Sequence, residues 1–314
     1  MLKYSSIFLC LFYLNQARAL PVINDTLPVS HAGGLRFLVL GDWGRNGSFH
    51  QKKVADAMGI TAKRANSSFI ITTGDNFYEH GVKDTSDPQW QTSFENVYTA
   101  SSLQIPWFPV LGNHDYNFNP DAQVAYKGSA ARWTMSARYY DTSLAVGTDS
   151  LLLVFMDTDP VEQEFLGRPY DSLRRPEGAV EKQLLWLNQA LAGSKARWKI
   201  VVGHNPLHTG GARRHSSRTR KMRNILEPVF SKYSIDLYLS GHEHHLEYLK
   251  PPGTTHYVIS GAGSEARHVG KLKRYRRFAA RKTGFVAISL TGNVLELEFI
   301  DGNGHTLYQY DIRK

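Results

Sequence analysis

Residues 235–245 read IDLYLSGHEHH, an apolar run that ends in a glycine and two histidines separated by one residue. The run 235–240 has the length and composition of a β-strand, and Gly241 begins the loop at its carboxyl end. On such a turn His242 and His244 can reach two neighbouring metal ions, whereas positions two apart on a helix diverge. A single pair of this kind is also common among surface histidines. Whether His242 and His244 bind metal therefore has to be judged from other parts of the chain.

Four more apolar runs end in the same way, in a glycine followed by a side chain that can bind a metal. They are 35–40 before Gly41-Asp42, 69–73 before Gly74-Asp75, 107–111 before Gly112-Asn113-His114, and 198–202 before Gly203-His204. Continuous apolarity is typical of strands buried on both faces. Since α/β sheets hold their sites at the carboxyl ends of the strands, we expect the five loops to converge.

Between and after these runs lie the patterns of further elements. Apolar residues at helical spacing predict helices over 49–65, 178–191 and 217–230, and further strands are expected at 150–156, 256–260, 284–290, 294–300 and 306–311. This order predicts an α/β fold with two packed mixed β-sheets flanked by helices, in a single domain over 35–314. The polar segment 157–177, which contains three prolines, is expected to be an exposed loop.

The N-terminus has the pattern of an export signal. Residues 1–19 combine a basic start at Lys3, an apolar run and the cleavage pattern Ala17-Arg18-Ala19, and 20–34 is expected to be an irregular lead-in. The apolar run is too short to span a membrane, so we expect a secreted or otherwise extracytoplasmic protein without an anchor. The only cysteine, Cys10, lies in this segment, which excludes disulfides from the mature chain. The three Asn-x-Ser/Thr sequons, at Asn24, Asn46 and Asn66, predict a glycoprotein in a eukaryotic host.

The charge of the chain favours anionic partners. The net charge of +9 becomes +7 when Lys3 and Arg18 leave with the signal. Two tracts concentrate it, and they contain Arg213, Arg214, Arg218, Arg220, Lys221 and Arg223, and Arg267, Lys271, Lys273, Arg274, Arg276, Arg277, Arg281 and Lys282. They either attract anionic substrates or are solvated surface charges. Stacking aromatics are sparse there, so no nucleic-acid partner is expected, and we expect a monomer.

The five loops, in the order Asp, Asp, Asn-His, His, His-x-His, resemble the signature of dinuclear metallophosphoesterases. Tyr78, in Gly74-Asp75-Asn76-Phe77-Tyr78, narrows the resemblance to the purple acid phosphatases, in particular the small mammalian-type tartrate-resistant (type 5-like) ones. Taken singly, Asp42 could cap a helix, Tyr78 could be a core aromatic and Asn113 a turn residue. All five loops occur in the order of the family over residues 35–311, and this combination is much more specific than any of these residues alone.

The resemblance implies the four-layer metallophosphoesterase sandwich and a set of metal ligands. Asp42, Tyr78 and His244 would bind the first metal, Asp75 would bridge both, and Asn113, His204 and His242 would bind the second. Two carboxylates and a phenolate suit Fe(III), and the second donor set suits Fe(II), Zn(II) or Mn(II).

The activity implied is hydrolysis of phosphomonoesters such as aryl phosphates, phosphoproteins and nucleotides, by direct attack of metal-bound hydroxide without a phosphoenzyme. His114, next to the ligand Asn113, is the expected general acid or phosphate-binding residue, with a purely structural histidine as the alternative. Asp115 is either a carboxylate that orients an imidazole or a solvated turn residue.

One position departs from the resemblance. A histidine preceded by a glutamate is expected nine residues after His204, where this chain has Arg213 preceded by Ala212. His208 or His215 could take that role, and we favour His215, whereas an arginine would bind phosphate bidentately. Alternative functions are a phosphodiesterase or nucleotidase on the same scaffold and a non-catalytic protein that binds phosphate or metal.

Overall fold

The computed structural model describes residues 34–128, 131–164, 178–270 and 274–314. The expected signal 1–19, nearly all of the lead-in, the sequon at Asn24, and the tract residues Lys271 and Lys273 lie outside the described residues. No described helix is both long enough and apolar enough to cross a bilayer.

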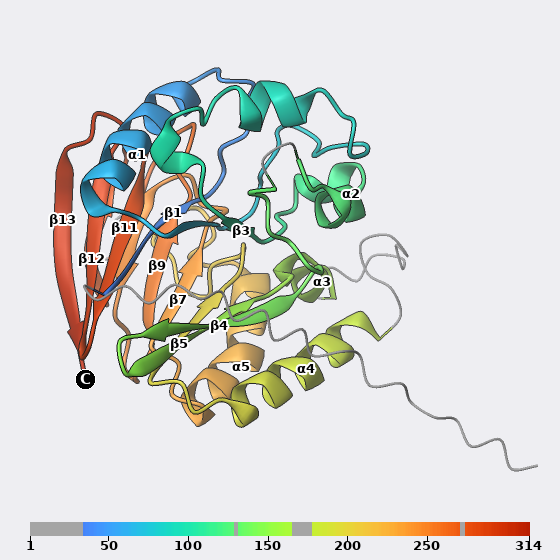
Figure 1. The fold of residues 1–314 in the computed structure, drawn as a ribbon. Helices are drawn as coiled ribbons and strands as arrows, with labels where there is room; N and C mark the ends of the chain where they lie inside the picture. The colour runs from blue at the N-terminus through green and yellow to red at the C-terminus, as the bar shows by residue number, and fades with distance from the viewer. Residues whose placement is uncertain (1–33, 129–130, 165–177, 271–273) are drawn as a thin grey trace, which may run out of the picture.

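Two mixed β-sheets form the centre of the fold (Figure 1). The first has the order β13-β12-β11-β1-β2-β3 and consists of β1 (Leu35–Leu40), β2 (Phe69–Thr72), β3 (Trp107–Pro109), β11 (Gly284–Thr291), β12 (Val294–Asp301) and β13 (Thr306–Arg313). The second has the order β10-β8-β9-β7-β6-β5-β4 and consists of β4 (Tyr140–Val146), β5 (Asp149–Phe155), β6 (Trp198–Val202), β7 (Leu237–Ser240), β8 (Leu246–Leu249), β9 (His256–Ser260) and β10 (Arg276–Ala280).

The parallel pairs bring the predicted loops to one edge of each sheet. In the first sheet β1, β2 and β3 run parallel, and in the second β5, β6, β7 and β9 do. All five glycine-ligand turns follow strands of these parallel sets. Parallel strands end at the same edge, which is the condition for their loops to meet.

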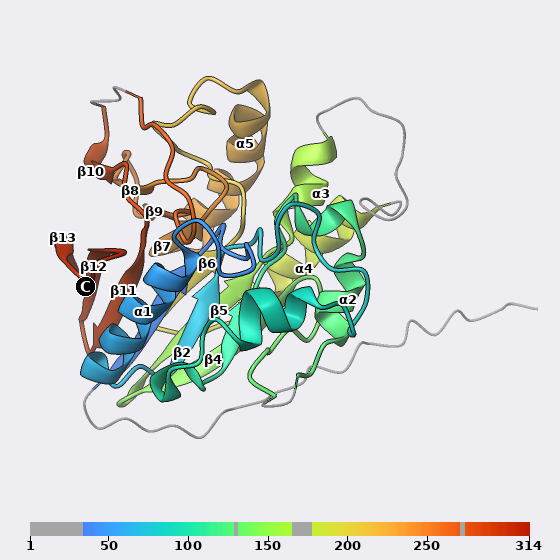
Figure 2. The same ribbon diagram turned by 90° about the horizontal axis from the view of Figure 1, so that it is seen from above.

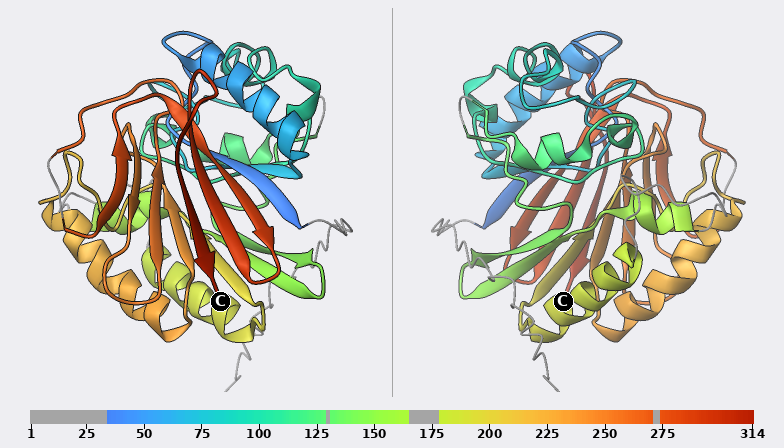
Figure 3. Two further views of the ribbon diagram at one scale, coloured as in Figure 1. Left: turned by 90° about the vertical axis from the view of Figure 1, so that its left-hand side faces the viewer. Right: turned by 90° about the vertical axis from the view of Figure 1, so that its right-hand side faces the viewer.

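The sheets pack face to face between two layers of helices (Figures 1 and 3). Alternate side chains of β5 show the layering. Leu151 and Leu153 join the core between the sheets, whereas Leu152 packs into a second core with Leu187 of α4 and Leu226 of α5. Helix α1 (Gln51–Ala65) covers the first sheet, and α4 (Ala179–Gly193) and α5 (Ser217–Lys232) cover the second. The predicted fold class, two mixed sheets flanked by helices, is confirmed.

Several elements depart from the sequence prediction. Strands β4, β8 and β10 and the short helices α2 (Pro120–Ala125) and α3 (Thr158–Gln163) were not predicted. The predicted exposed loop 157–177 is wrong over 158–162, which are buried in α3. Polar Thr158 is accommodated there because its hydroxyl oxygen accepts hydrogen bonds from the backbone N–H groups of His204 and Asn205, both at 3.0 Å. The remainder of that segment, 165–177, lies outside the described residues.

Candidate metal centre

The five loops do converge, at the edge where the two sheets meet. The loops after β1, β2 and β3 come from the first sheet, and those after β6 and β7 come from the second. Backbone hydrogen bonds join them within each sheet: Asp42 N–H donates to Gly74 O at 3.0 Å and Gly241 N–H to His204 O at 3.0 Å. Between the sheets, His242 N–H donates to the Asp42 carboxylate at 2.9 Å. In Figure 2 the blue loop after β1 overlies the ends of β6 and β7.

Three of the predicted ligands have an unusual backbone. Asp42, Asp75 and His242 lie in the left-handed region, with φ of 58°, 49° and 68°. Such a conformation costs about 1–3 kcal/mol at a non-glycine residue and is concentrated at functional sites. The neighbouring glycines permit close packing. A Cβ on Gly112 would lie 2.3 Å from the Asp75 carboxylate, so no larger residue fits there.

One group of donors surrounds the Tyr78 phenol. Its oxygen lies 3.0 Å from Asp42 Oδ1, 3.0 Å from Asp75 Oδ2 and 3.2 Å from His244 Nε2. His244 Nε2 is also 3.4 Å from Asp42 Oδ1. All four side chains are buried. The predicted first set of ligands is therefore brought together, with the phenol turned toward its partners.

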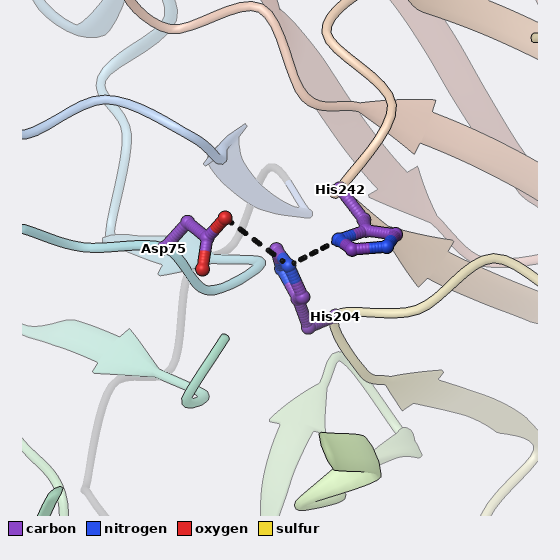
Figure 4. A group of neighbouring side chains, drawn as sticks. All are labelled: Asp75, His204 and His242. Carbon is purple, nitrogen blue, oxygen red and sulfur yellow. Dashed lines mark hydrogen bonds and ion pairs between the residues drawn. The ribbon is translucent and has the colours of Figure 1, made fainter. Parts of the chain in front are cut away.

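A second group surrounds the His204 imidazole (Figure 4). His204 Nε2 lies 2.9 Å from His242 Nδ1, 3.2 Å from Asn113 Oδ1 and 3.4 Å from Asp75 Oδ2. His204 Nδ1 is 2.8 Å from the carbonyl of Thr73, which fixes the ring so that Nε2 points into the group. Asp75 Oδ2 belongs to both groups, as a bridging carboxylate requires.

The donors fit a pair of cations. Ligands about 2.1 Å from one ion at right angles stand roughly 3 Å apart, which is the spacing found in both groups. Without a metal, burial and the charges of His204 and Arg213 hold the pKa of His242 well below its usual range, so its imidazole is neutral. Burial opposes protonation of His204, but the Asp75 carboxylate outweighs it and raises the pKa of His204 to about 10, so a metal that binds His204 Nε2 must displace a proton there. Burial and the carboxylates of Asp42 and Asp75 raise the pKa of Tyr78 well above its usual value. Its phenolate thus needs a highly charged cation among these oxygens.

His114 borders this cluster. Its backbone N–H donates to Asp75 Oδ1 at 2.8 Å, and its ring lies against Tyr78 with centroids 4.5 Å apart. Nδ1 is 2.6 Å from the carbonyl of Glu79, so Nδ1 carries a hydrogen and the second proton of the ring would sit on Nε2. The side chain is 29% exposed, which gives it contact with solvent as well as with the cluster.

Comparison with known proteins adds independent information. Residues 35–246 match the calcineurin-like phosphoesterase family. Purple acid phosphatase 17 of Arabidopsis thaliana is 35% identical over 295 residues, which cover 90% of this chain and 86% of that protein. Tartrate-resistant acid phosphatase type 5 of Rattus norvegicus is 32% identical, with 88% and 90% covered. The chain belongs to the purple acid phosphatase family. A dinuclear metal centre follows from this membership and from the buried group of Asp75, His204 and His242.

Solved structures support the fold. "GAP50 the anchor in the inner membrane complex of Plasmodium" is 28% identical, with a TM-score of 0.79, and the match covers 90% of this chain and 89% of that one. The purple acid phosphatase PPD1 from yellow lupin seeds has a TM-score of 0.67 over 90% of this chain and 54% of its own, and at 17% identity it supports the fold alone.

In this member of the purple acid phosphatase family, the three candidates for the missing histidine lie in different surroundings. His208 pairs with Glu227 at 2.5 Å. His215 is exposed, and its Nε2 accepts from Arg214 Nε at 3.1 Å; no contact among the described residues joins it to the cluster. Arg213 is half-buried, its backbone N–H donates to the Glu243 carboxylate at 2.6 Å, and its charge acts on His242. The role of His215 stays a prediction.

Asp115 is buried, and it connects two loops of the centre. Its carboxylate accepts backbone hydrogen bonds from Gly112 at 2.8 Å and from Asn76 at 3.0 Å. Gln123 Nε2 donates to it at 2.8 Å. Its side-chain partners are thus amides rather than an imidazole, and it fixes the loops that carry Asp75 and Asn113.

Sequence reasoning did not identify three residues next to the ligands. The Arg45 guanidinium lies over the Tyr78 ring, 3.9 Å from its centroid, and pairs with Glu265 at 3.4 Å. Glu265 in turn lies 3.3 Å from His244 Nδ1. Glu243, between the two histidines of the last loop, accepts hydrogen bonds from Ala212 N–H and Arg213 N–H. Arg45 and Glu243 have a sequence signal only in their closeness to a ligand, and Glu265 has none, because their roles arise from contacts across the fold.

Proposed function

We propose that this protein is an exported acid phosphatase that hydrolyses phosphomonoesters at a dinuclear Fe(III)–M(II) centre, where M is iron, zinc or manganese. One observation carries the proposal: seven side chains from five loops form two donor groups that share the Asp75 carboxylate. Membership of the purple acid phosphatase family supports the same activity.

The two donor groups divide the metals between them. Asp42, Tyr78 and His244 would hold the trivalent ion, because carboxylates and phenolate are hard anionic donors. Asn113, His204 and His242 would hold the divalent ion, because an amide oxygen and neutral imidazoles suit it. Bound there, such ions would lower the pKa of a water molecule and offset the charge of the phosphate oxygens.

His114 is the residue we assign to proton transfer. During hydrolysis a water oxygen joins phosphorus, the bond from phosphorus to the leaving oxygen breaks, and that oxygen takes up a proton. The proton held at His114 Nε2 can supply it, since Nδ1 is engaged with the carbonyl of Glu79. Contact of the ring with Tyr78 keeps it beside the donor groups.

Arg213 is our candidate for the phosphate-binding residue at the entrance of the site, in place of the histidine expected there. Its backbone is fixed by Glu243, the residue between His242 and His244. A guanidinium can bind two phosphate oxygens at once through parallel hydrogen bonds. The exposed His215 is the weaker candidate for the same role.

The decisive experiment measures metal content, visible absorption and turnover on the purified protein. We expect two metals per chain, a tyrosinate-to-iron absorption band, and hydrolysis of phenyl phosphate well above that of diphenyl phosphate. The reverse preference would favour the phosphodiesterase alternative. A colourless protein with zinc or manganese alone would contradict the Fe(III) assignment.

The likeness to GAP50 favours a second candidate, a non-catalytic protein that uses this fold as an anchor. It predicts that metals, if bound, give no turnover of either ester. The presence of all seven donors and of His114 in one cluster favours catalysis instead.

Export and glycosylation complete the proposal. The predicted signal 1–19 supports export, and the sequon residues Asn46 and Asn66 are exposed. Treatment of the protein from a eukaryotic host with an N-glycosidase should lower its apparent mass.

A further inference from the structure

We propose that a cavity beside the metal centre, bounded by Phe49, Lys53 and Arg281, binds the leaving group of the substrate and selects leaving groups that join a ring to a second anion. A nucleoside phosphate has this chemistry. The inference rests on the proposed phosphatase function and adds to it a subsite with its own residues.

The cavity has a volume of about 440 Å³. It lies where the start of α1, the loop after β9 and the turns after β10 and β12 meet. Backbone contact joins two of these segments, since His50 N–H donates to Ser264 O at 3.0 Å. Its walls therefore belong to both sheets and to the helix that covers the first.

Two wall residues connect the cavity to the donor groups. The Arg45 guanidinium lies between two rings, 3.9 Å from the centroid of Tyr78 and 4.8 Å from that of Phe49. Glu265, which lines the cavity, is 3.3 Å from His244 Nδ1. The Arg45 side chain thus contacts both Phe49 and Tyr78, and Glu265 lines the cavity and contacts the outer nitrogen of the ligand His244. A substrate with its phosphate at the metals can extend into this space.

Phe49 offers a ring to a ligand. It is 67% exposed, in a part of the structure where most aromatic side chains are buried. Its backbone is in the left-handed region, with φ of 57°, which is an outlier for a bulky residue and is typical of functional sites. An exposed aromatic face next to a cation stacks readily with a heterocyclic or aryl ring.

The charges of the cavity favour an anion. The lining carboxylates are already paired: Glu265 with Arg45 and Arg267, and Asp301 with Lys282 at 3.3 Å. Lys53 and Arg281 are exposed, and neither forms an ion pair or side-chain hydrogen bond among the described residues. Two cations without a carboxylate partner, beside a free aromatic face, match a phosphate attached to a ring system.

The test compares two substrates in matched variants. Phenyl phosphate has a leaving group with a ring and no second anion, whereas ADP releases AMP, which has both. In Lys53→Gln/Arg281→Gln we expect the ratio of kcat/KM for ADP to kcat/KM for phenyl phosphate to fall about tenfold, mainly through KM for ADP. Phe49→Ala should lower kcat/KM for both substrates by about tenfold, because each leaving group has a ring that loses its stacking partner. The control is Lys52→Gln, because Lys52 is exposed on the same helix and pairs with Asp56.

A binding measurement makes the subsite testable apart from turnover. In the presence of saturating inorganic phosphate, which occupies the metals, equilibrium dialysis should show AMP bound more weakly by the double variant than by the wild-type and Lys52→Gln proteins. Unchanged AMP affinity in the double variant, or an equal loss of kcat/KM for both substrates in that variant, would overturn the subsite. A wild-type protein that binds AMP in this way but hydrolyses neither ester would refute the proposed phosphatase function and leave the subsite standing.

Discussion

At the scale of single residues, Tyr78 is the proposed ligand that distinguishes this centre from one built only of carboxylates, amides and imidazoles. Its phenol contacts three of the proposed ligands, and burial together with the carboxylates of Asp42 and Asp75 raises its pKa well above the usual value. A phenol in these surroundings loses its proton to solvent only when a strongly charged cation binds its oxygen. Tyr78 is therefore the most direct reporter of what the centre binds.

Tyr78→Phe should remove the visible absorption band while the protein stays folded, because the ring still packs against His114 and Arg45. Absorption spectra and metal analysis of the two proteins check this. A band that persists in the variant would show that another residue supplies the colour. The control is Tyr98→Phe, since the Tyr98 hydroxyl is buried outside the cluster.

His114→Ala should keep both metals and lower kcat by about 10²–10⁴-fold, the typical contribution of a general acid. The loss should be larger for substrates with poor leaving groups, such as alkyl phosphates, than for 4-nitrophenyl phosphate, whose leaving group needs little protonation. Steady-state kinetics with both esters measure the difference. Loss of metal instead would identify His114 as a ligand, and an equal loss for both esters would argue for phosphate binding.

At the scale of elements, the loop 209–214, which carries Arg213, is held by two buried carboxylates, one in the last ligand loop and one in the strand after it. Glu243 accepts from the backbone of Ala212 and Arg213, and Glu247 accepts from the backbone of Gly210 at 2.8 Å. Glu247 is fully buried and is paired with Arg276 of β10 at 2.6 Å. Arg276, which belongs to the second basic tract, thus has a structural role and is not a free surface charge.

Arg276→Met should destabilise the protein by roughly 2 kcal/mol, because the buried Glu247 carboxylate loses its charged hydrogen bond to the guanidinium and keeps only His245, at 3.0 Å, as an ionic partner. Denaturant unfolding measures the change, and Arg277→Met is the matched control from the exposed face of the same strand. The double variant Glu247→Gln/Arg276→Met should be less unstable than the sum of the single variants, since the carboxylate that lost its guanidinium is then uncharged and Gln can still bond His245 and the backbone of Gly210. A double variant as unstable as the sum of the single ones would contradict this reading.

Prediction from sequence succeeded for elements with an apolar pattern and failed where polar residues are paired in the interior. The ligand loops follow apolar strands, so their convergence could be predicted. By contrast, β10 contains Arg276 and Arg277 within a basic tract, and its apolar signal is weak. Helix α3 buries Thr158 and Asp159, which in the sequence look like loop residues. The contacts of Arg45 and Glu265 join segments about 220 residues apart, which no local pattern reveals.

At the scale of the whole molecule, the stability of the fold should depend on pH through a histidine remote from the centre. Burial, with the charges of Lys250 and Arg277, lowers the pKa of His256 to about 4. As the pH falls from 6.5 to 4, the unfolded chain binds a proton at this position and the folded protein does not. The free energy of unfolding therefore decreases over this window, by roughly 3 kcal/mol, and is unaffected by this group above it.

His256→Asn should flatten the pH dependence of unfolding between pH 6.5 and 4. Asn can still accept the hydrogen bond that Tyr248 donates to His256 Nδ1 at 2.7 Å. Urea unfolding at several pH values measures the slope, and His305→Asn, at a 76% exposed side chain, serves as the control. The idea fails if the His256→Asn protein and the wild type lose stability in parallel.

The ligand loops come from both sheets, and this has a consequence for how the protein assembles. An ion held between Asp42 and His244, or between Asp75 and His204, is a crosslink between the N-terminal and C-terminal halves of the chain. Binding of the ion and unfolding of the chain are then linked equilibria. Each tenfold increase in free ion concentration above the dissociation constant raises the free energy of unfolding by about 1.4 kcal/mol. The supply of metal would thereby decide how much of the newly made chain survives proteolysis.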